Sequence, residues 1–274
     1  MEKYSGKVKV RACFRSQEKA QPLVDKYESQ ANFEAMTNVD ASSADTLARA
    51  LEGATYAVLV TPHDPARGLS DDADLTANMI NAAAEAGVKH IIYVGSWTVK
   101  APEAIKMIAS RFSPSEELLE TLGSKGGPKW TILRSGFFFN NLAGLIGSGL
   151  KTGMAAFPNL HLPAVDPRDL GKIAAAIVSE GKSDVHHGKK YEISGPEMLT
   201  VRDIITRVSK AVGKNIVFQE LQVEDMKLPP FLLECFKYIS DNGSDAIPLD
   251  GITKQLCGEH TALEAWLQSQ NIGA

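Results

Sequence analysis

Two hydrophobic periodicities alternate along the first half of the chain. Short runs rich in Val, Ile and other apolar residues predict strands buried on both faces, and amphipathic stretches predict helices between them. The predicted strands are 7–15, 32–38, 56–62, 89–96 and 129–135, and the predicted helices are 17–29, 42–51, 74–87 and 113–122. Strands that alternate with helices in this way indicate an α/β fold with a doubly wound parallel sheet.

Residues typical of helix starts support these boundaries. Ser42 and Asp45 have the spacing of a capping box, and Ser113 with Glu116 have the same spacing at the start of a later helix. Thr200 is expected to cap a further helix near the C-terminal end of the chain. Each of these segments is therefore predicted to be a separate helix with a defined beginning.

The pattern becomes less regular after Ser135. We expect residues 1–135 to form the first domain, with the helix predicted at 166–181 packing back on it. Residues 136–165 and 182–274 are then expected to form a smaller domain on the substrate side.

Composition and charge narrow the function classes. The chain has 274 residues, of which 44% are hydrophobic and 23% charged, and a net charge of −4 without a basic stripe, so we expect no nucleic-acid partner. The most apolar stretch, 137–150, is too short to span a bilayer, and no signal peptide is evident, so a cytoplasmic protein is expected. Cys13, Cys235 and Cys257 are interpreted as unpaired thiols, and His186-His187 as a surface turn and not a metal site.

With this order of elements, the chain resembles the NmrA-like family, a branch of the atypical short-chain dehydrogenase/reductases. The likeness rests on VRACFRS, ALEGATYAVLVTP, AAAEAGVKHIIYVGS, WTILRSGFFFNNL, VDPRDLGKIAAAIV and YEISGPEMLTVRDI in this order. The resemblance implies a Rossmann-like domain with a smaller substrate-side region and a nicotinamide cofactor. It also implies one of two activities, reduction of quinones, dyes or imines, or regulation by sensing the cofactor.

One element of the family pattern is absent from the sequence. Members begin with a strand and a GxxGxxG turn, whose backbone amides bind the pyrophosphate, and no GxxGxxG occurs in these 274 residues. Either the chain is an N-terminally truncated gene model or isoform, or it is a natural protein that lacks the loop. We expect the strand at 7–15 to join the sheet of strand 56–62, with strand 32–38 on its outer side. Weak NADPH binding and a tendency to aggregate are expected as well.

The resemblance and the strand ends together indicate a cofactor site. Arg15 follows a strand where an acidic residue would favour NAD, and a guanidinium there accommodates the 2′-phosphate of NADP. NADP is therefore the expected cofactor, with NAD as the alternative. The candidate cofactor residues are Arg15, Ser16, Lys19, Asp40, Thr61, Pro62, Ser96 and Gly136.

The candidate catalytic residues are fewer. Ser96 stands where typical short-chain dehydrogenases have a catalytic serine, but no YxxxK follows it, so Ser96 is only a weak candidate and the catalytic acid is unknown. Phe137 and Phe138, with Asn140 and Asn141, are candidates for a substrate pocket; a core aromatic cluster is the alternative.

Three functions compete. The first is an NADPH-dependent oxidoreductase that transfers hydride to a quinone-like or other small planar aromatic acceptor, which needs no strong protein acid. The second is a non-catalytic NADP(H) sensor that binds a protein partner, and the third is an inactive truncated form. None of them involves a metal, a nucleic acid or a membrane.

Overall fold

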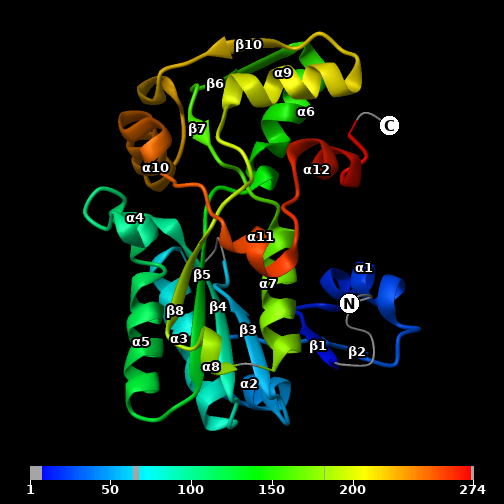
Figure 1. Ribbon diagram of the computed structural model, residues 1–274, viewed down its shortest axis with the longest axis vertical. Coiled ribbons are helices and arrows are strands. Elements are labelled where there is room, and N and C mark those ends of the chain that lie inside the picture. Colours follow the sequence, from blue (N-terminus) through cyan, green and yellow to red (C-terminus); the bar gives the residue numbers. More distant parts are fainter. Residues whose placement is uncertain (1–7, 64–67, 182, 273–274) are drawn as a thin grey trace. The chain divides into compact units, whose positions relative to one another are not determined.

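The computed structural model describes residues 8–63, 68–181 and 183–272 (Figure 1). These residues form two compact units, and the chain passes between them several times. The first unit comprises the described residues up to Gly95, then Arg111–Ile132 and Ala174–Lys190. The second comprises Ser96–Ser110, Leu133–Ile173 and the described residues from Tyr191 onward. The division near residue 135 that the sequence suggests stays a prediction.

A four-stranded sheet confirms the predicted α/β class. Its strand order is β3 (Tyr56–Val60), β4 (His90–Ser96), β5 (Lys129–Ser135) and β8 (Lys189–Ile193). β3 and β4 pair in parallel, with Tyr56 opposite His90 and Val60 opposite Val94. Six of the seven residues of β4 are buried, as the uninterrupted apolar run predicts for a strand covered on both faces.

Helices of the first unit pack beside this sheet. α3 (Ser70–Glu85) contacts both α2 (Ala44–Leu51) and α5 (Ser113–Ser124), whereas α1 (Gln17–Tyr27) contacts β2 (Phe33–Met36). A hydrophobic core forms where apolar faces of α2, α3 and α5 meet β3, β4 and β5. Its buried members include Leu47, Leu51, Leu59, Ile80, Ala83, Ile91, Tyr93, Leu119, Trp130 and Ile132.

The N-terminal strands form a sheet of their own. β1 (Val10–Cys13) pairs in parallel with β2, as expected, but the expectation that it joins the sheet of β3 is wrong for the described residues. β3 is therefore an edge strand, and its Val58 and Val60 side chains are 51% and 59% exposed. β1 is instead tied to the end of α2, because the Arg11 guanidinium donates to the carbonyls of Ala50 (3.0 Å) and Glu52 (2.8 Å).

The second unit is built from short elements. β6 (Met154–Phe157) pairs in parallel with β10 (Val217–Glu220), and β7 (His161–Leu162) pairs antiparallel with β9 (Leu199–Thr200). The remaining elements of the chain are η2 (Trp97–Lys100), α4 (Lys106–Ala109), η3 (Phe139–Leu142), α6 (Ala143–Thr152), β6 (Met154–Phe157), β7 (His161–Leu162), α7 (Pro167–Glu180), α8 (Ser183–His186), β9 (Leu199–Thr200), α9 (Val201–Val212), β10 (Val217–Glu220), η4 (Val223–Asp225), α10 (Pro230–Asn242), η5 (Gly243–Asp245), α11 (Ile252–Cys257) and α12 (Leu263–Ser269).

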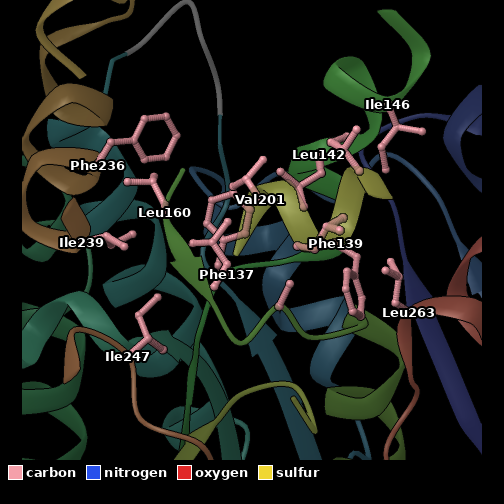
Figure 2. Packing of buried hydrophobic residues seen from close by; sticks show 14 of the residues in the cluster. Phe137, Phe139, Leu142, Ile146, Leu160, Val201, Phe236, Ile239, Ile247 and Leu263 are labelled. Atoms are coloured by element: carbon pink, nitrogen blue, oxygen red, sulfur yellow. The ribbon is translucent and has the colours of Figure 1, made fainter. Parts of the chain in front are cut away.

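Aromatic side chains organise the core of the second unit (Figure 2). Phe139 stacks on Trp266 with ring centroids 5.4 Å apart, and Phe137 packs against Phe236 at 6.4 Å. Both Phe137 and Phe139 are buried among aliphatic residues from several helices. Because such rings contribute large buried areas, this cluster accounts for much of the stability of the unit.

Both predicted capping boxes are wrong, whereas the predicted cap at Thr200 is confirmed. Thr200 and Asp203 form both hydrogen bonds of a capping box at the start of α9. At α2, the N-cap is Ser43 without a side-chain hydrogen bond. α5 begins at Ser113 itself, so its N-cap is Phe112, and no side chain caps the helix there. Glu116 is buried. The spacing alone could not distinguish a capping residue from one turned toward a tertiary partner.

Two negative findings concern the described residues. The three cysteines form no disulfide with one another. No helix among these residues has both the length and the apolar character needed to cross a membrane.

Gly195 permits a close approach between two backbone segments. A Cβ at this position would lie 1.9 Å from the carbonyl oxygen of Ala164. We predict that Gly195→Ala lowers the free energy of unfolding by about 3 kcal/mol or more, because backbone must move to admit the methyl group. Denaturant unfolding of the variant measures this.

Gly171, inside α7, supplies the matched control. Nothing lies within 4 Å of a Cβ placed there, so Gly171→Ala should raise the free energy of unfolding by about 1 kcal/mol through helix propensity. Equal stability of the two alanine variants would contradict the packing described at Gly195.

A buried histidine makes the stability of the first unit depend on pH. His90 is fully buried, and its Nε2 lies 2.8 Å from the hydroxyl of Thr131. That hydroxyl donates to the carbonyl of His186, so it accepts from His90, whose Nδ1 is buried without a partner among the described residues. Burial is the main cause that lowers the pKa of His90 to about 4.

The neutral form of His90 therefore stabilises the fold. An unfolded histidine has a pKa near 6.5, so this contribution is complete above that pH and is lost as the pH falls from about 6.5 to 4, by about 3 kcal/mol in all. We predict that His90→Gln has a flatter dependence of unfolding free energy on pH in this window. Parallel curves for the two proteins would contradict the assignment.

Candidate functional site

A cavity of about 340 Å³ lies in the first unit where several strands end. Arg15 follows β1, Asp40 follows β2, and Pro62 follows β3. The full lining is Arg15, Asn38, Val39, Asp40, Ala41, Pro62 and Leu75. Ligands of open α/β sheets bind beyond the carboxyl ends of the strands, so this is the best candidate for a ligand site in the described residues.

The turn after β2 shapes one wall of the cavity. Asn38 has φ of 59°, a left-handed conformation that Asn tolerates better than most residues. It brings Asp40 to the cavity, where the Asp40 Oδ1 accepts from both the backbone N–H and the hydroxyl of Ser42, each at 2.8 Å. Asp40 therefore orders the segment before α2 as well as lining the cavity.

Arg15 also lines the cavity. Its Nη2 donates to the carbonyl of His63, at 3.3 Å. Next to it, the Ser16 hydroxyl caps α1 by accepting from the backbone N–H of Lys19 at 3.4 Å, and the Lys19 side chain is exposed. The structure thus places Arg15, Asp40 and Pro62 on one cavity, with Ser16 and Lys19 on the helix that follows Arg15.

A buried charged cluster was missed by sequence reasoning. Asp72, on the first turn of α3, is fully buried, and its Oδ2 accepts from the Nε of Arg111 at 2.7 Å. The Nδ1 of His63 lies 3.4 Å from the same oxygen. Sequence reasoning missed the cluster because His63 and Arg111 lie 9 and 39 positions from Asp72 in the chain.

Half-buried Thr61 and buried Tyr93 form a second polar pair near the end of β3. Their hydroxyl oxygens are 2.8 Å apart. Burial is the main cause that raises the pKa of Tyr93 to about 12, so its phenol is neutral at physiological pH. Tyr93 precedes Ser96 in β4 and fully lacks solvent exposure, which makes it a structural group and not a proton donor to a bound ligand.

Glu116 is neutralised by a lysine from β8. The Lys190 Nζ lies 3.3 Å from Glu116 Oε2 and also forms an ion pair with Glu120. Burial lowers the pKa of Lys190, but its hydrogen bond to Glu120 and the charge of Glu116 outweigh this and raise it. A Cβ on Gly95 would lie 3.3 Å from Ile132 Cγ2 and 3.5 Å from Glu116 Oε1, so the strand packs closely against both side chains.

The remaining candidate residues lie in the second unit. The Ser96 hydroxyl caps η2 by accepting from the backbone N–H of Thr98 at 3.3 Å. The backbone N–H of Gly136 donates to the carbonyl of Ile193 at 2.7 Å. A Cβ on Gly136 would lie 3.2 Å from that oxygen, so close backbone packing accounts for this glycine.

The aromatic candidates have mainly packing contacts. Phe137 is buried in the core, and Phe138 forms a β-bridge with Val165. Asn140 accepts a hydrogen bond from the indole N–H of Trp266 at 3.3 Å, and Asn141 is exposed. The proposal that these residues form a substrate pocket therefore stays a prediction.

The interpretation of His186-His187 as a surface turn is wrong for His186, which is buried. The Thr131 hydroxyl donates a hydrogen bond to the His186 carbonyl and holds the backbone at His186 in place.

The part of the chain that the structure describes contains no group of three or more His, Cys, Asp or Glu residues arranged to hold a metal ion.

Comparison with known proteins decides the family. The model of the NmrA-like family matches residues 3–245. The chain belongs to the NmrA-like family. This confirms the resemblance that the sequence motifs indicated.

Two curated relatives are reductases. The (4-alkanoyl-5-oxo-2,5-dihydrofuran-3-yl)methyl phosphate reductase of Streptomyces griseus subsp. griseus is 32% identical over 199 residues, which are 69% of this chain and 65% of that protein. The NAD(P)H azoreductase of Xenophilus azovorans is 26% identical over 185 residues, which are 66% of this chain and 60% of that protein. The chain therefore matches less than two thirds of the length of each.

The fold of this family member also matches solved structures. The NADPH-dependent quinone oxidoreductase of Escherichia coli, solved with NADPH, aligns with a TM-score of 0.75 at 24% sequence identity. The alignment covers 98% of this chain and 93% of that one. This similarity establishes the Rossmann-like fold of the chain.

Proposed function

We propose that this NmrA-like protein binds NADP(H) at the cavity beside Arg15 and reduces a small planar acceptor, such as a quinone or another aromatic compound, by hydride transfer. The observation that carries the proposal is the gathering of Arg15, Asp40 and Pro62 around one cavity. Residues after three different strands meet there, at the edge where nucleotides bind in Rossmann-like folds.

The chemistry of the lining fits the adenosine end of NADP. The Arg15 guanidinium offers planar donors to a 2′-phosphate, and Val39 and Leu75 offer apolar surface to the adenine. Asp40 is the acidic residue of the lining, and an acceptor there suits the adenine amine or a ribose hydroxyl.

The acceptor class is inferred from the two hydroxyl side chains of β4, Ser96 and Tyr93. When bound, NADPH supplies a hydride. A quinone that accepts it becomes a hydroquinone anion, which takes its proton from water. The described residues show Ser96 engaged as a helix cap and Tyr93 buried, so an acceptor that needs no strong protein acid fits best. The relatives described as azoreductase and quinone oxidoreductase support the same class.

The first prediction concerns cofactor preference. Arg15→Ala should weaken NADPH binding about 10- to 100-fold and NADH binding much less, because a charge-assisted hydrogen bond contributes about 1.5–3 kcal/mol. Titration of nucleotide fluorescence measures both affinities. Lys125→Ala, which removes an exposed cation after α5, is the matched control and should change neither. Equal losses for both nucleotides in Arg15→Ala would contradict the role of Arg15.

The second prediction concerns turnover. The chain should oxidise NADPH in the presence of members of a quinone and azo-dye panel, measured by the loss of NADPH absorbance. A parallel version with an added strand–GxxGxxG unit ahead of residue 8 should bind NADPH more tightly and turn over faster. NADPH binding without turnover in both versions would instead support the cofactor-sensing alternative, and absence of both would contradict the proposed function.

A further inference from the structure

The segment that follows β3 is held by a charge inside the protein. The Asp72 carboxylate is fully buried, and the Nε of Arg111 donates to its Oδ2 at 2.7 Å. The His63 Nδ1 lies 3.4 Å from the same oxygen. The other carboxylate oxygen, Oδ1, is buried without a hydrogen-bond partner among the described residues. A buried carboxylate is costly unless compensated, so Asp72 favours keeping both neighbours in place.

This contact fixes which ring nitrogen of His63 carries a proton. A carboxylate accepts but does not donate, so Nδ1 must be the donor toward Asp72. The opposite nitrogen, Nε2, has no hydrogen-bond partner in the part of the chain that the structure describes. The side chain as a whole is 53% exposed, although its partner Asp72 is not exposed at all. The ring therefore has one anchored nitrogen and one available to a ligand.

The same residue adjoins the candidate nucleotide cavity. The carbonyl of His63 accepts from the Arg15 guanidinium at 3.3 Å, and its chain neighbour Pro62 lines the cavity together with Arg15. Leu75, one turn along α3 from Asp72, lines the cavity as well. Arg15, which lines the cavity, therefore contacts His63, and Asp72 is the buried residue that contacts the His63 ring.

We propose that His63, oriented by Asp72, is a second binding residue for the phosphate group that Arg15 binds, and that the two together select a 2′-phosphorylated adenosine. The inference rests on the proposed function, because it concerns the same nucleotide. In this arrangement His63 binds as the imidazolium, with Nδ1–H donating to Asp72 and Nε2–H donating to a phosphate oxygen. Asp72 is a positioning residue that does not touch the ligand.

The physical case rests on charge placement. An imidazolium between a carboxylate and a phosphate has an anion on each side and is attracted to both. Arg111 already balances the charge of Asp72 within the protein, so the positive charge of His63 is left for the ligand. Two cationic donors from different loops also fix the position of a phosphate better than one, which gives selectivity as well as affinity.

Binding of two nucleotide fragments to the whole chain tests the inference. Adenosine 2′,5′-bisphosphate and adenosine 5′-monophosphate differ only in the 2′-phosphate. Calorimetry gives both dissociation constants, and the selectivity ratio is that of the monophosphate divided by that of the bisphosphate. This ratio should fall about tenfold in His63→Ala, and Asp72→Asn should lower it in the same direction. His187→Ala removes another exposed histidine, beside Trp130, and should leave the ratio unchanged.

A double-variant cycle adds a second measurement. If both residues bind one phosphate, the loss in Arg15→Ala/His63→Ala should differ from the product of the two single losses. Because His63 is exposed, its replacement should keep the protein folded, and a thermal melt confirms this for each variant.

The outcomes separate the inference from the proposed function. A ratio that falls in Arg15→Ala but not in His63→Ala would overturn the inference and leave the function standing. A ratio unaffected by either substitution, or no binding of either fragment, would overturn both. A fall in His63→Ala with no change in Asp72→Asn would overturn the positioning role of Asp72.

Discussion

The polarity of parallel strands is the constraint on which the candidate site depends. β1, β2 and β3 each end just before a residue that lines the cavity, although β1 and β2 form a separate sheet from β3. No strand among the described residues lies between β1 and β3 and hydrogen-bonds to both. Side-chain hydrogen bonds therefore connect the sheet of β1 to its neighbours. Arg11 ties β1 to the end of α2, and Arg15 reaches the carbonyl of His63 after β3.

Much of the fold was predictable because it depends on local pattern. The apolar runs located the strands β3, β4 and β5, and the motifs located the family. The turn after a strand is likewise a local feature, so Arg15, Asp40 and Pro62 could be named in advance as residues that follow strand ends. Whether they bind a cofactor is a question of function that the pattern does not decide.

The rest could not be predicted because it depends on tertiary partners. Glu116 has the spacing of a capping residue, yet a lysine from β8, 74 positions later in the chain, holds its carboxylate. Phe137 and Phe139 suit a pocket wall as well as a core, and only the packing of Phe236 and Trp266 against them places both in the core. The Asp72 cluster has no sequence signature, because its three members lie in separate segments.

The central claim is that the cavity beside Arg15 holds the adenosine 2′-phosphate end of NADP. A crystal structure of the chain with NADPH tests it most directly. The account predicts the 2′-phosphate within hydrogen-bond distance of the Arg15 guanidinium, with the adenine between Val39 and Leu75. A nucleotide bound elsewhere, or one whose 2′-phosphate faces solvent while Arg15 keeps its bond to the His63 carbonyl, would contradict it.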